Sequence, residues 1–245
     1  VDVESIIDDA VFGEGDRMTS FIIPSSWAYA ADLPPLPFDQ EAAAALLDEA
    51  GWVDDDNDPT TPRVAQGAMY AEDGTPLSFT LFTNEGNARR EAVATIFQDQ
   101  LQQIGFQVNF QTIDFNVLLD IMDSQTFDAF ILGWRNGYPD DPDVTQILTG
   151  AGDVIASGSN NTSYYNERFD ELNLLANTPS ETDGCSTEGR RPYYVEMQEI
   201  FQEDLPYVPL FTIGGMYAAQ SSVSGFNPYP SQMYWNINSW AVNTP

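Results

Sequence analysis

The chain lacks histidine and lysine and has a single cysteine among its 245 residues. Because it has no histidine, the sequence excludes a Ser-His-Asp or Cys-His catalytic arrangement and a His-ligated zinc site within these residues. The one cysteine, Cys185, forms neither an internal disulfide nor a Cys-rich metal site, so any disulfide partner lies in other polypeptide. The composition does not exclude acid–base catalysis by two carboxylates, so a carboxylate-pair hydrolase is one alternative function.

Long apolar runs are also absent. No stretch of eighteen consecutive apolar residues occurs, so the sequence predicts no membrane-spanning helix. The first sixteen residues have neither the basic segment nor the apolar segment of a signal peptide. We therefore expect that any export signal has been removed or lies upstream of Val1.

Positive charge is scarce. Eight arginines stand against 38 aspartates and glutamates, which gives a net charge of −30. Such a surface repels nucleic acid and anionic membranes, because no basic patch is present to displace their counterions. Most of the carboxylates are expected to form a solvated acidic coat, which is a device of salt-adapted proteins. The composition therefore predicts no nucleic-acid partner.

The densest acidic stretch, "VDDDNDPTTPR", allows two interpretations. Asp54, Asp56 and Asp58 have the alternating spacing of a calcium-binding loop. The pattern then fails, because Pro59 stands where an EF-hand needs glycine and Ala65 stands where it needs glutamate. A solvated acidic loop is the favoured interpretation, and a calcium site or a calcium-dependent structural module is the alternative.

The middle of the chain shows the clearest periodicity. Apolar alternation, helical spacing and an unbroken apolar run predict the order strand, helix, strand, helix, strand. These elements cover residues 77–83, 87–104, 106–112, 115–124 and 128–134. The last strand is apolar on both faces, which predicts a buried position in the sheet. Connections of this length favour parallel strands with right-handed crossovers. The fold class is therefore α/β, with a mostly parallel sheet flanked by helices.

Weaker signals indicate the remaining elements. A helix is expected over 4–12, and another between an N-cap at Asp39 and a stop at Gly51. The segment between these helices is rich in proline and aromatic residues and is expected to be extended. Further along the chain we expect helices over 166–176 and 190–205, a strand over 206–213 and an aperiodic, aromatic final segment.

Two loops follow predicted strands at their carboxyl ends, where open parallel sheets bind ligands. They are "TNEGNARR" after the first strand and "GWRNGYPDDPD" after the third. Together they offer aromatic faces and hydrogen-bonding groups, as a ligand cleft requires. The candidate side chains are Asn84, Glu85, Asn87, Trp134, Asn136, Tyr138, Asp140 and Asp141.

A structural interpretation of the second loop stays open. Trp134 then caps the sheet, Pro139 and Pro142 stiffen a turn, and Asp140 caps the next segment. Spacing alone favours this structural interpretation over ligand contact.

Several motifs, taken together and in order, resemble a known family. "PFDQEAAAALLDEAGW", "LSFTLFTNEGNARREAVATIFQDQLQQIGFQV", "FDAFILGWRNGYPDDPD", "YYNERFDEL" and "EIFQEDLPYVPLF" are similar to the C-terminal half of peptide/nickel-type (family 5) extracellular solute-binding proteins of ABC importers. The resemblance implies a lobe of the periplasmic-binding-protein-like (type II) fold that binds solute and is not an enzyme. Residues 1–214 would form the second lobe, and 215–245 would return toward the first.

The resemblance also implies partners and a location. A missing N-terminal lobe, the permease subunits and a small solute would be the partners. The protein would be extracellular or periplasmic, and anchored to the membrane through an N-terminal lipoprotein segment that is absent from this chain.

The resemblance bears on the second loop residue by residue. In peptide-binding relatives, the tryptophan that matches Trp134 lines the pocket, and an aspartate three residues later pairs with the peptide amine. Gly137 occupies that later position here, so the aspartate is missing. The positions of arginines that some relatives use for the ligand carboxylate match Met122 and Ile131. An uncharged or cationic solute, or an oligosaccharide stacked on Trp134 and Tyr138, is therefore the alternative to a peptide.

Overall fold

A three-stranded parallel sheet forms the centre of one half of the molecule. The computed structural model describes residues 1–135, 140–229 and 232–243. The sheet contains β4 (Ser78–Asn84), β5 (Gln107–Ile113) and β6 (Ala129–Phe130), in the order β5-β4-β6. β4 pairs with β5 from Ser78↔Gln107 to Asn84↔Ile113, and with β6 at Leu81↔Ala129 and Phe82↔Phe130. The predicted α/β class with parallel strands is confirmed.

Two predicted strands are much shorter than expected. The run over 128–134 forms a strand only at Ala129–Phe130 and is half-buried, so the prediction of a long buried strand was wrong. β6 pairs only with β4 in the described sheet, and its chain departs after the Ile131 amide donates to the Phe82 carbonyl (2.8 Å). Likewise, the run over 206–213 contributes only β7 (Phe211–Thr212), which pairs antiparallel with β1 (Asp16–Arg17).

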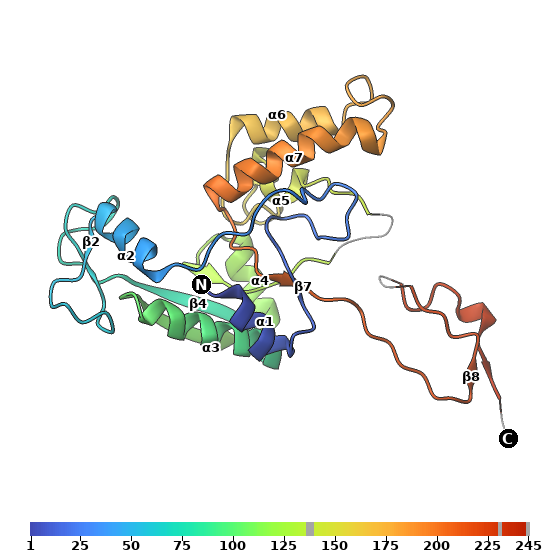
Figure 1. Cartoon of the computed structure of the whole chain (residues 1–245), viewed down its shortest axis with the longest axis horizontal. Coiled ribbons are helices and arrows are strands. Elements are labelled where there is room, and N and C mark those ends of the chain that lie inside the picture. Colours follow the sequence, from blue (N-terminus) through green and yellow to red (C-terminus); the bar gives the residue numbers. More distant parts are fainter. Residues whose placement is uncertain (136–139, 230–231, 244–245) are drawn as a thin grey trace.

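Helices pack on this sheet. α3 (Ala88–Gln102) and α4 (Phe115–Asp123) pack against the strands, and α1 (Val3–Val11) packs on α3 (Figure 1). Ile6 and Ala10 of α1 meet Val93 of α3 in one small cluster. Leu81, Ala94 and Val108 join β4, α3 and β5 in another. The strands β4–β6 with these three helices are called the sheet unit below.

Local signals set the next boundaries as expected. The Asp39 carboxylate accepts from the Ala42 amide and caps α2 (Gln40–Glu49). Gly51 follows at φ +84°, and a Cβ there would lie 2.7 Å from the Ala68 amide nitrogen, so only glycine fits. β2 (Trp52–Val53) then pairs antiparallel with β3 (Val64–Ala65).

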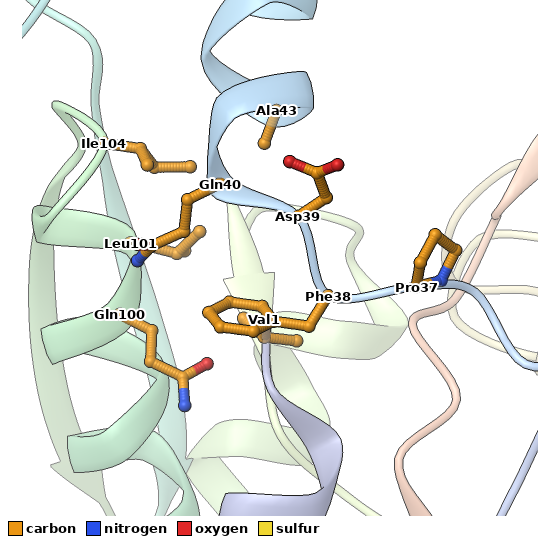
Figure 2. A pocket seen from close by; sticks show the side chains of 9 residues that line it. All are labelled: Val1, Pro37, Phe38, Asp39, Gln40, Ala43, Gln100, Leu101 and Ile104. Carbon is orange, nitrogen blue, oxygen red and sulfur yellow. The ribbon is translucent and has the colours of Figure 1, made fainter.

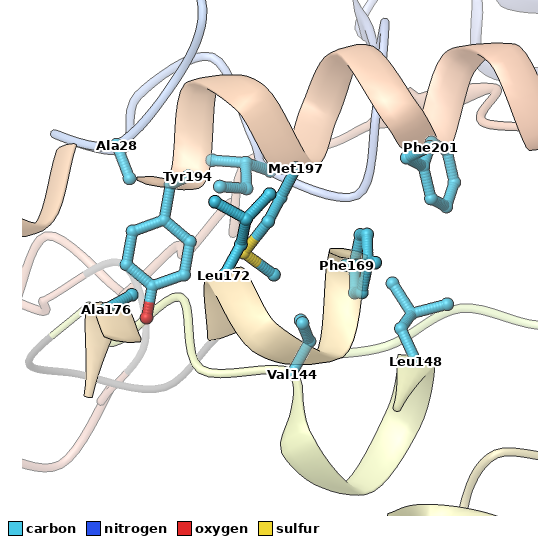
Figure 3. Packing of buried hydrophobic residues seen from close by; sticks show 10 residues of the cluster. Ala28, Val144, Leu148, Phe169, Leu172, Ala176, Tyr194, Met197 and Phe201 are labelled. Atoms are coloured by element: carbon cyan, nitrogen blue, oxygen red, sulfur yellow. The ribbon is translucent and has the colours of Figure 1, made fainter. Parts of the chain in front are cut away.

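A second half of the molecule is helical. It contains α5 (Thr145–Leu148), η1 (Gly150–Gly152), α6 (Glu167–Ala176) and α7 (Thr187–Asp204). α7 begins three residues earlier than predicted, because the Ser186 hydroxyl accepts from the Gly189 amide and caps it. Figure 3 shows the side chains of this core between α5, α6 and α7. These helices with the segment 20–30 are called the helical unit below.

The segment 20–30 is fixed to α7 by one buried amide. Gln198 is completely buried, and its Oε1 accepts from the Ser20 hydroxyl (2.8 Å) and the Ala30 amide (3.2 Å). Its Nε2 donates to the carbonyls of Ala28 (3.0 Å) and Tyr194 (2.9 Å). All its hydrogen-bonding capacity is used, so a segment without periodicity becomes part of a core. The expectation that this segment is extended was wrong, because it folds into turns in which the Ser26 amide donates to the Ile23 carbonyl (3.0 Å) and the Tyr29 amide to the Ser26 carbonyl (3.2 Å).

After β7 the chain leaves the body of the molecule (Figure 1). It forms β8 (Val223–Ser224), η2 (Ile237–Ser239) and β9 (Ala241–Val242), with β8 and β9 antiparallel. Aromatic rings of this projecting segment pack on one another, for example Phe226 on Trp240 with centroids 5.0 Å apart. None of the helices that the structure describes is both long and apolar enough to cross a membrane.

Candidate functional site

The carboxyl ends of β4 and β6 bring the two predicted loops to one edge of the sheet. The strands are parallel neighbours, and the buried Thr83 hydroxyl donates to the Ile131 carbonyl (2.9 Å) where they end. The expectation that both loops leave the same edge is therefore confirmed. In Figure 1, β4 runs toward the side of the molecule from which the projecting segment departs.

Two of the three candidate side chains in the loop after β4 make hydrogen bonds within the chain. The Asn87 side chain caps α3 by accepting from the Arg90 amide (3.1 Å). The Asn84 Oδ1 accepts from Arg90 Nη1, and its Nδ2 donates to the Glu85 carbonyl (3.1 Å). The Glu85 side chain is exposed and has no hydrogen bond within the described residues. Of these three candidates, Glu85 is thus the one whose side chain is available to a ligand.

The loop after β6 begins with an exposed aromatic residue. Trp134 is 58% exposed, so it does not cap the sheet as a core residue would. An exposed indole at the carboxyl edge of a parallel sheet presents an apolar face where a ligand would bind. Three other candidates, Asn136, Gly137 and Tyr138, lie outside the described residues.

The two aspartates at the end of this loop hold it in place. The Asp140 carboxylate accepts from the Ser26 hydroxyl, and its carbonyl accepts from Trp27 Nε1 (3.4 Å). The Asp141 Oδ1 lies 2.9 Å from Arg190 Nη2. Both contacts reach the helical unit, so these side chains fasten the loop. Asp140 thus has a structural role, but it does not cap the next segment as the structural interpretation proposed.

Arg190 is the centre of this attachment, and sequence analysis did not identify it. Its Nε donates to the Ala176 carbonyl (3.0 Å), and its Nη2 also donates to Asn177 Oδ1 and Tyr194 Oη (both 2.8 Å). The guanidinium lies 5.4 Å from the ring centroids of both Trp27 and Tyr194. Burial disfavours the charge, but the hydrogen bond that Arg190 donates to Asp141 and the nearby phenol of Tyr194 outweigh it and raise the pKa of Arg190.

The acidic stretch after α2 does not gather its carboxylates. Asp56 Oδ1 accepts from the Asp58 amide (2.9 Å), and Asp58 Oδ1 accepts from the Thr60 amide (3.0 Å) and hydroxyl (2.6 Å). The hydroxyl and amide of Thr60 lower the pKa of Asp58. Within the described ranges no three His, Cys, Asp or Glu side chains form a group able to hold a metal ion. Calcium binding by Asp54, Asp56 and Asp58 stays a prediction.

A small cavity lies away from the loops. It has a volume of about 110 Å³ and is bounded by α2, the amino-terminal residue Val1 and the last turns of α3 (Figure 2). Leu101 of α3, Ile104 just after that helix, and Phe38 line it. This end of α3 is remote from the carboxyl edge of the sheet, so the cavity is not part of the candidate site.

Comparison with known proteins agrees with this architecture. The family model for bacterial extracellular solute-binding proteins, family 5 (middle), matches residues 1–155, which is more than half of the chain. The chain belongs to family 5 of the bacterial extracellular solute-binding proteins. The solute-binding proteins of this family are extracellular or periplasmic.

Individual family 5 relatives match most of this chain. It is 30% identical to the oligopeptide-binding protein AppA of Bacillus subtilis, over 98% of this chain and 42% of AppA. It is 28% identical to di/tripeptide-binding protein 2 of Pseudomonas aeruginosa, over 84% of this chain and 34% of that protein. The chain thus spans less than half the length of the curated relatives it matches.

Solved structures confirm the predicted lobe. The structure of AppA in complex with a nonapeptide matches all of this chain and 46% of AppA, with a TM-score of 0.80 and 27% identity. A mannohexaose-bound binding protein of Thermotoga maritima matches 96% of this chain and 43% of that protein, with a TM-score of 0.73 and 20% identity. The fold is that of a periplasmic-binding-protein-like α/β lobe.

Proposed function

We propose that this chain is one lobe of the substrate-binding component of an ABC importer, and that it binds a peptide-like or other small solute between two lobes. The observation that carries the proposal is the exposed Trp134 at the carboxyl edge of β4 and β6, in a family 5 chain. The peptide ligands named for AppA and the di/tripeptide-binding protein support a peptide as the solute.

The proposed mechanism is closure of the lobes around the solute. A solute that contacts both lobes binds the closed form better and therefore shifts the population toward it. Trp134 and Tyr138 supply apolar faces, and Glu85 and Asn136 supply polar contacts. Asp140 and Asp141 act indirectly, because they hold the loop against the helical unit. No catalytic step is proposed.

The proposal also assigns this chain a place in a two-lobed protein. Residues 1–214 form the second lobe, and 215–245 return toward a first, N-terminal lobe. The exposed apolar side chains of the projecting segment support this, because exposed apolar patches mark interaction surfaces. They include Met216, Tyr234, Trp235, Ile237 and Val242. The closed form is recognised by permease subunits, and a lipoprotein segment before the first lobe anchors the protein.

An oligosaccharide is the second candidate solute. Exposed tryptophan faces suit stacking against sugar rings, and the mannohexaose-bound relative shares the fold. Calorimetric titration of the full-length protein with mannohexaose and with a pool of peptides would distinguish the two solutes.

Trp134→Ala in the full-length protein tests the proposal. We expect the affinity for the bound solute to fall by about tenfold or more, because an aromatic contact is lost, while the melting temperature stays unchanged. Tyr70→Ala is the matched control, because Tyr70 is completely exposed but lies on the loop after β3. Equal affinities for wild type and Trp134→Ala would contradict the assignment of the site.

A further inference from the structure

Six of the eight arginines make structural contacts within the chain. Each has a hydrogen bond or an ion pair that holds two segments together, as Arg63 does with Asp48 (2.6 Å) and the Ile104 carbonyl (3.0 Å). The structural arginines are Arg17, Arg63, Arg90, Arg168, Arg190 and Arg191. In a chain with so little positive charge, an arginine without such a role needs another explanation.

Arg89 and Arg135 are the two that remain. Both are exposed, and neither has a hydrogen bond or an ion pair in the part of the chain that the structure describes. Arg89 is the second residue of α3, directly after the loop from β4, and Arg135 follows Trp134 in the loop from β6. The two guanidinium groups without a partner among the described residues therefore lie in or next to the two loops at the carboxyl edge of the sheet, although the charge of the whole chain is −30.

The acidic side chains of the same loops are mostly occupied. Asp140 is bonded to Ser26 and Asp141 is paired with Arg190. Of the carboxylates predicted for the site, only Glu85 has no partner within the described residues. The sequence alone suggested loops suited to a cationic or uncharged solute. Among the described residues of these loops, the structure leaves two guanidinium groups and the Glu85 carboxylate without a hydrogen-bond partner.

We propose that the solute carries a carboxylate that binds Arg135, with Arg89 adding positive potential at the same edge, and that the protein prefers acidic peptides. This inference rests on the proposed binding function. A planar guanidinium binds a carboxylate through two parallel hydrogen bonds, which makes it suited to this role. The surrounding acidic coat repels acidic solutes elsewhere on the surface, so the two loops are where one would be held.

A randomised pentapeptide pool tests this preference. The full-length protein is incubated with the pool at physiological salt, where screening shortens the reach of the distant acidic coat to about 8 Å. Retained peptides are identified by mass spectrometry. We expect aspartate and glutamate to be enriched about tenfold over lysine at one peptide position, as one charge-assisted pair would give.

Substitutions of single arginines then show which residue causes the preference for acidic peptides. Arg135→Gln should abolish the enrichment while the total amount of retained peptide falls less than threefold, and Arg89→Gln should reduce the enrichment about twofold. Arg168→Gln is the matched control, because it removes the same charge from α6, and it should leave the enrichment unchanged.

Each other outcome has a definite meaning. Retained peptides without acidic enrichment, or an Arg135→Gln variant that loses acidic and neutral peptides equally, would overturn the charge preference and leave the binding function in place. Retention of no peptide by the wild type would overturn peptide binding itself, and the inference with it.

Discussion

The helical unit and the sheet unit are packed in different ways. Ten buried residues of the helical unit form one continuous cluster, with a further eight partly buried apolar residues against it. The sheet unit has separate clusters of three buried residues each, and few residues of its strands are buried: only Leu81 and Thr83 of β4 and Val108 of β5. The unit that carries the candidate binding edge therefore has the less complete core.

The second loop joins these two units. Ile131 packs on the clusters of the sheet unit, and Val144 is part of the core of the helical unit. Between them, Asp140 and Asp141 are tied to Ser26 and Arg190. The loop that presents Trp134 is thus held at both ends by contacts with the rest of the chain, and rigid scaffolds position binding residues in this way.

The same substitution in both cores measures the difference most directly. Leu172 in the helical unit and Leu81 in the sheet unit are both buried. We expect Leu172→Ala to cost about 4–5 kcal/mol of unfolding free energy and Leu81→Ala about 2–3 kcal/mol, because a tightly surrounded cavity relaxes less. Urea denaturation measures both values.

An exposed leucine provides the control for these two variants. Leu174 is 68% exposed on the same helix as Leu172, and Leu174→Ala should change the free energy of unfolding by less than about 0.5 kcal/mol. Equal costs for Leu172→Ala and Leu81→Ala would show that the two cores are packed alike and would remove the basis of the comparison.

Arg190→Ala tests whether the link between the units matters. Its guanidinium is mostly buried and makes several hydrogen bonds, so we expect a loss of about 2 kcal/mol of stability. Asp141→Asn should cost less than about 1 kcal/mol, because the Asp141 side chain is 62% exposed. Both variants should weaken solute binding in the full-length protein through the position of Trp134.

The double variant separates these effects. If Arg190 acts on binding through Asp141, the affinity lost in the double variant will equal that lost in Arg190→Ala alone. Additive losses of affinity in calorimetric titrations would instead show that each residue acts on the solute independently.

Local features of the fold could be predicted from the sequence, and distant ones could not. The cap at Asp39, the stop at Gly51 and the strand from 77 onward depend on neighbouring residues, and all three are present. The predicted length of the strand over 128–134 was wrong, because an apolar run does not show where pairing with β4 stops.

For the site, the positions of the loops could be predicted from the sequence, but the partners of their side chains could not. Asp141 and Arg190 are 49 residues apart, and Asp140 and Ser26 are 114 apart. No periodicity connects such pairs, so two aspartates that looked available to a ligand are fastened to the scaffold. Local chemistry placed the loops, while tertiary contacts decided which of their side chains remained available.

Alkaline pH should affect the helical unit through Tyr194. Burial raises the pKa of this phenol to about 12, although the charge of Arg190 opposes the shift. An unfolded tyrosine ionises near pH 10, so between pH 10 and 12 the unfolded chain loses a proton that the folded chain keeps, and stability falls as the pH rises. Urea midpoints measured from pH 8 to 12 should fall less steeply in Tyr194→Phe than in the wild type.

A variant of the exposed tyrosine on the loop after β3 is the control for this pH effect. Tyr70 is completely exposed, so Tyr70→Phe should follow the wild-type profile. Tyr164 and Tyr207, whose pKa values burial also raises, leave some alkaline sensitivity in the Tyr194→Phe variant. A wild-type slope in Tyr194→Phe would show that the ionisation of this phenol is not coupled to folding, and that the core around Arg190 admits water to its hydroxyl.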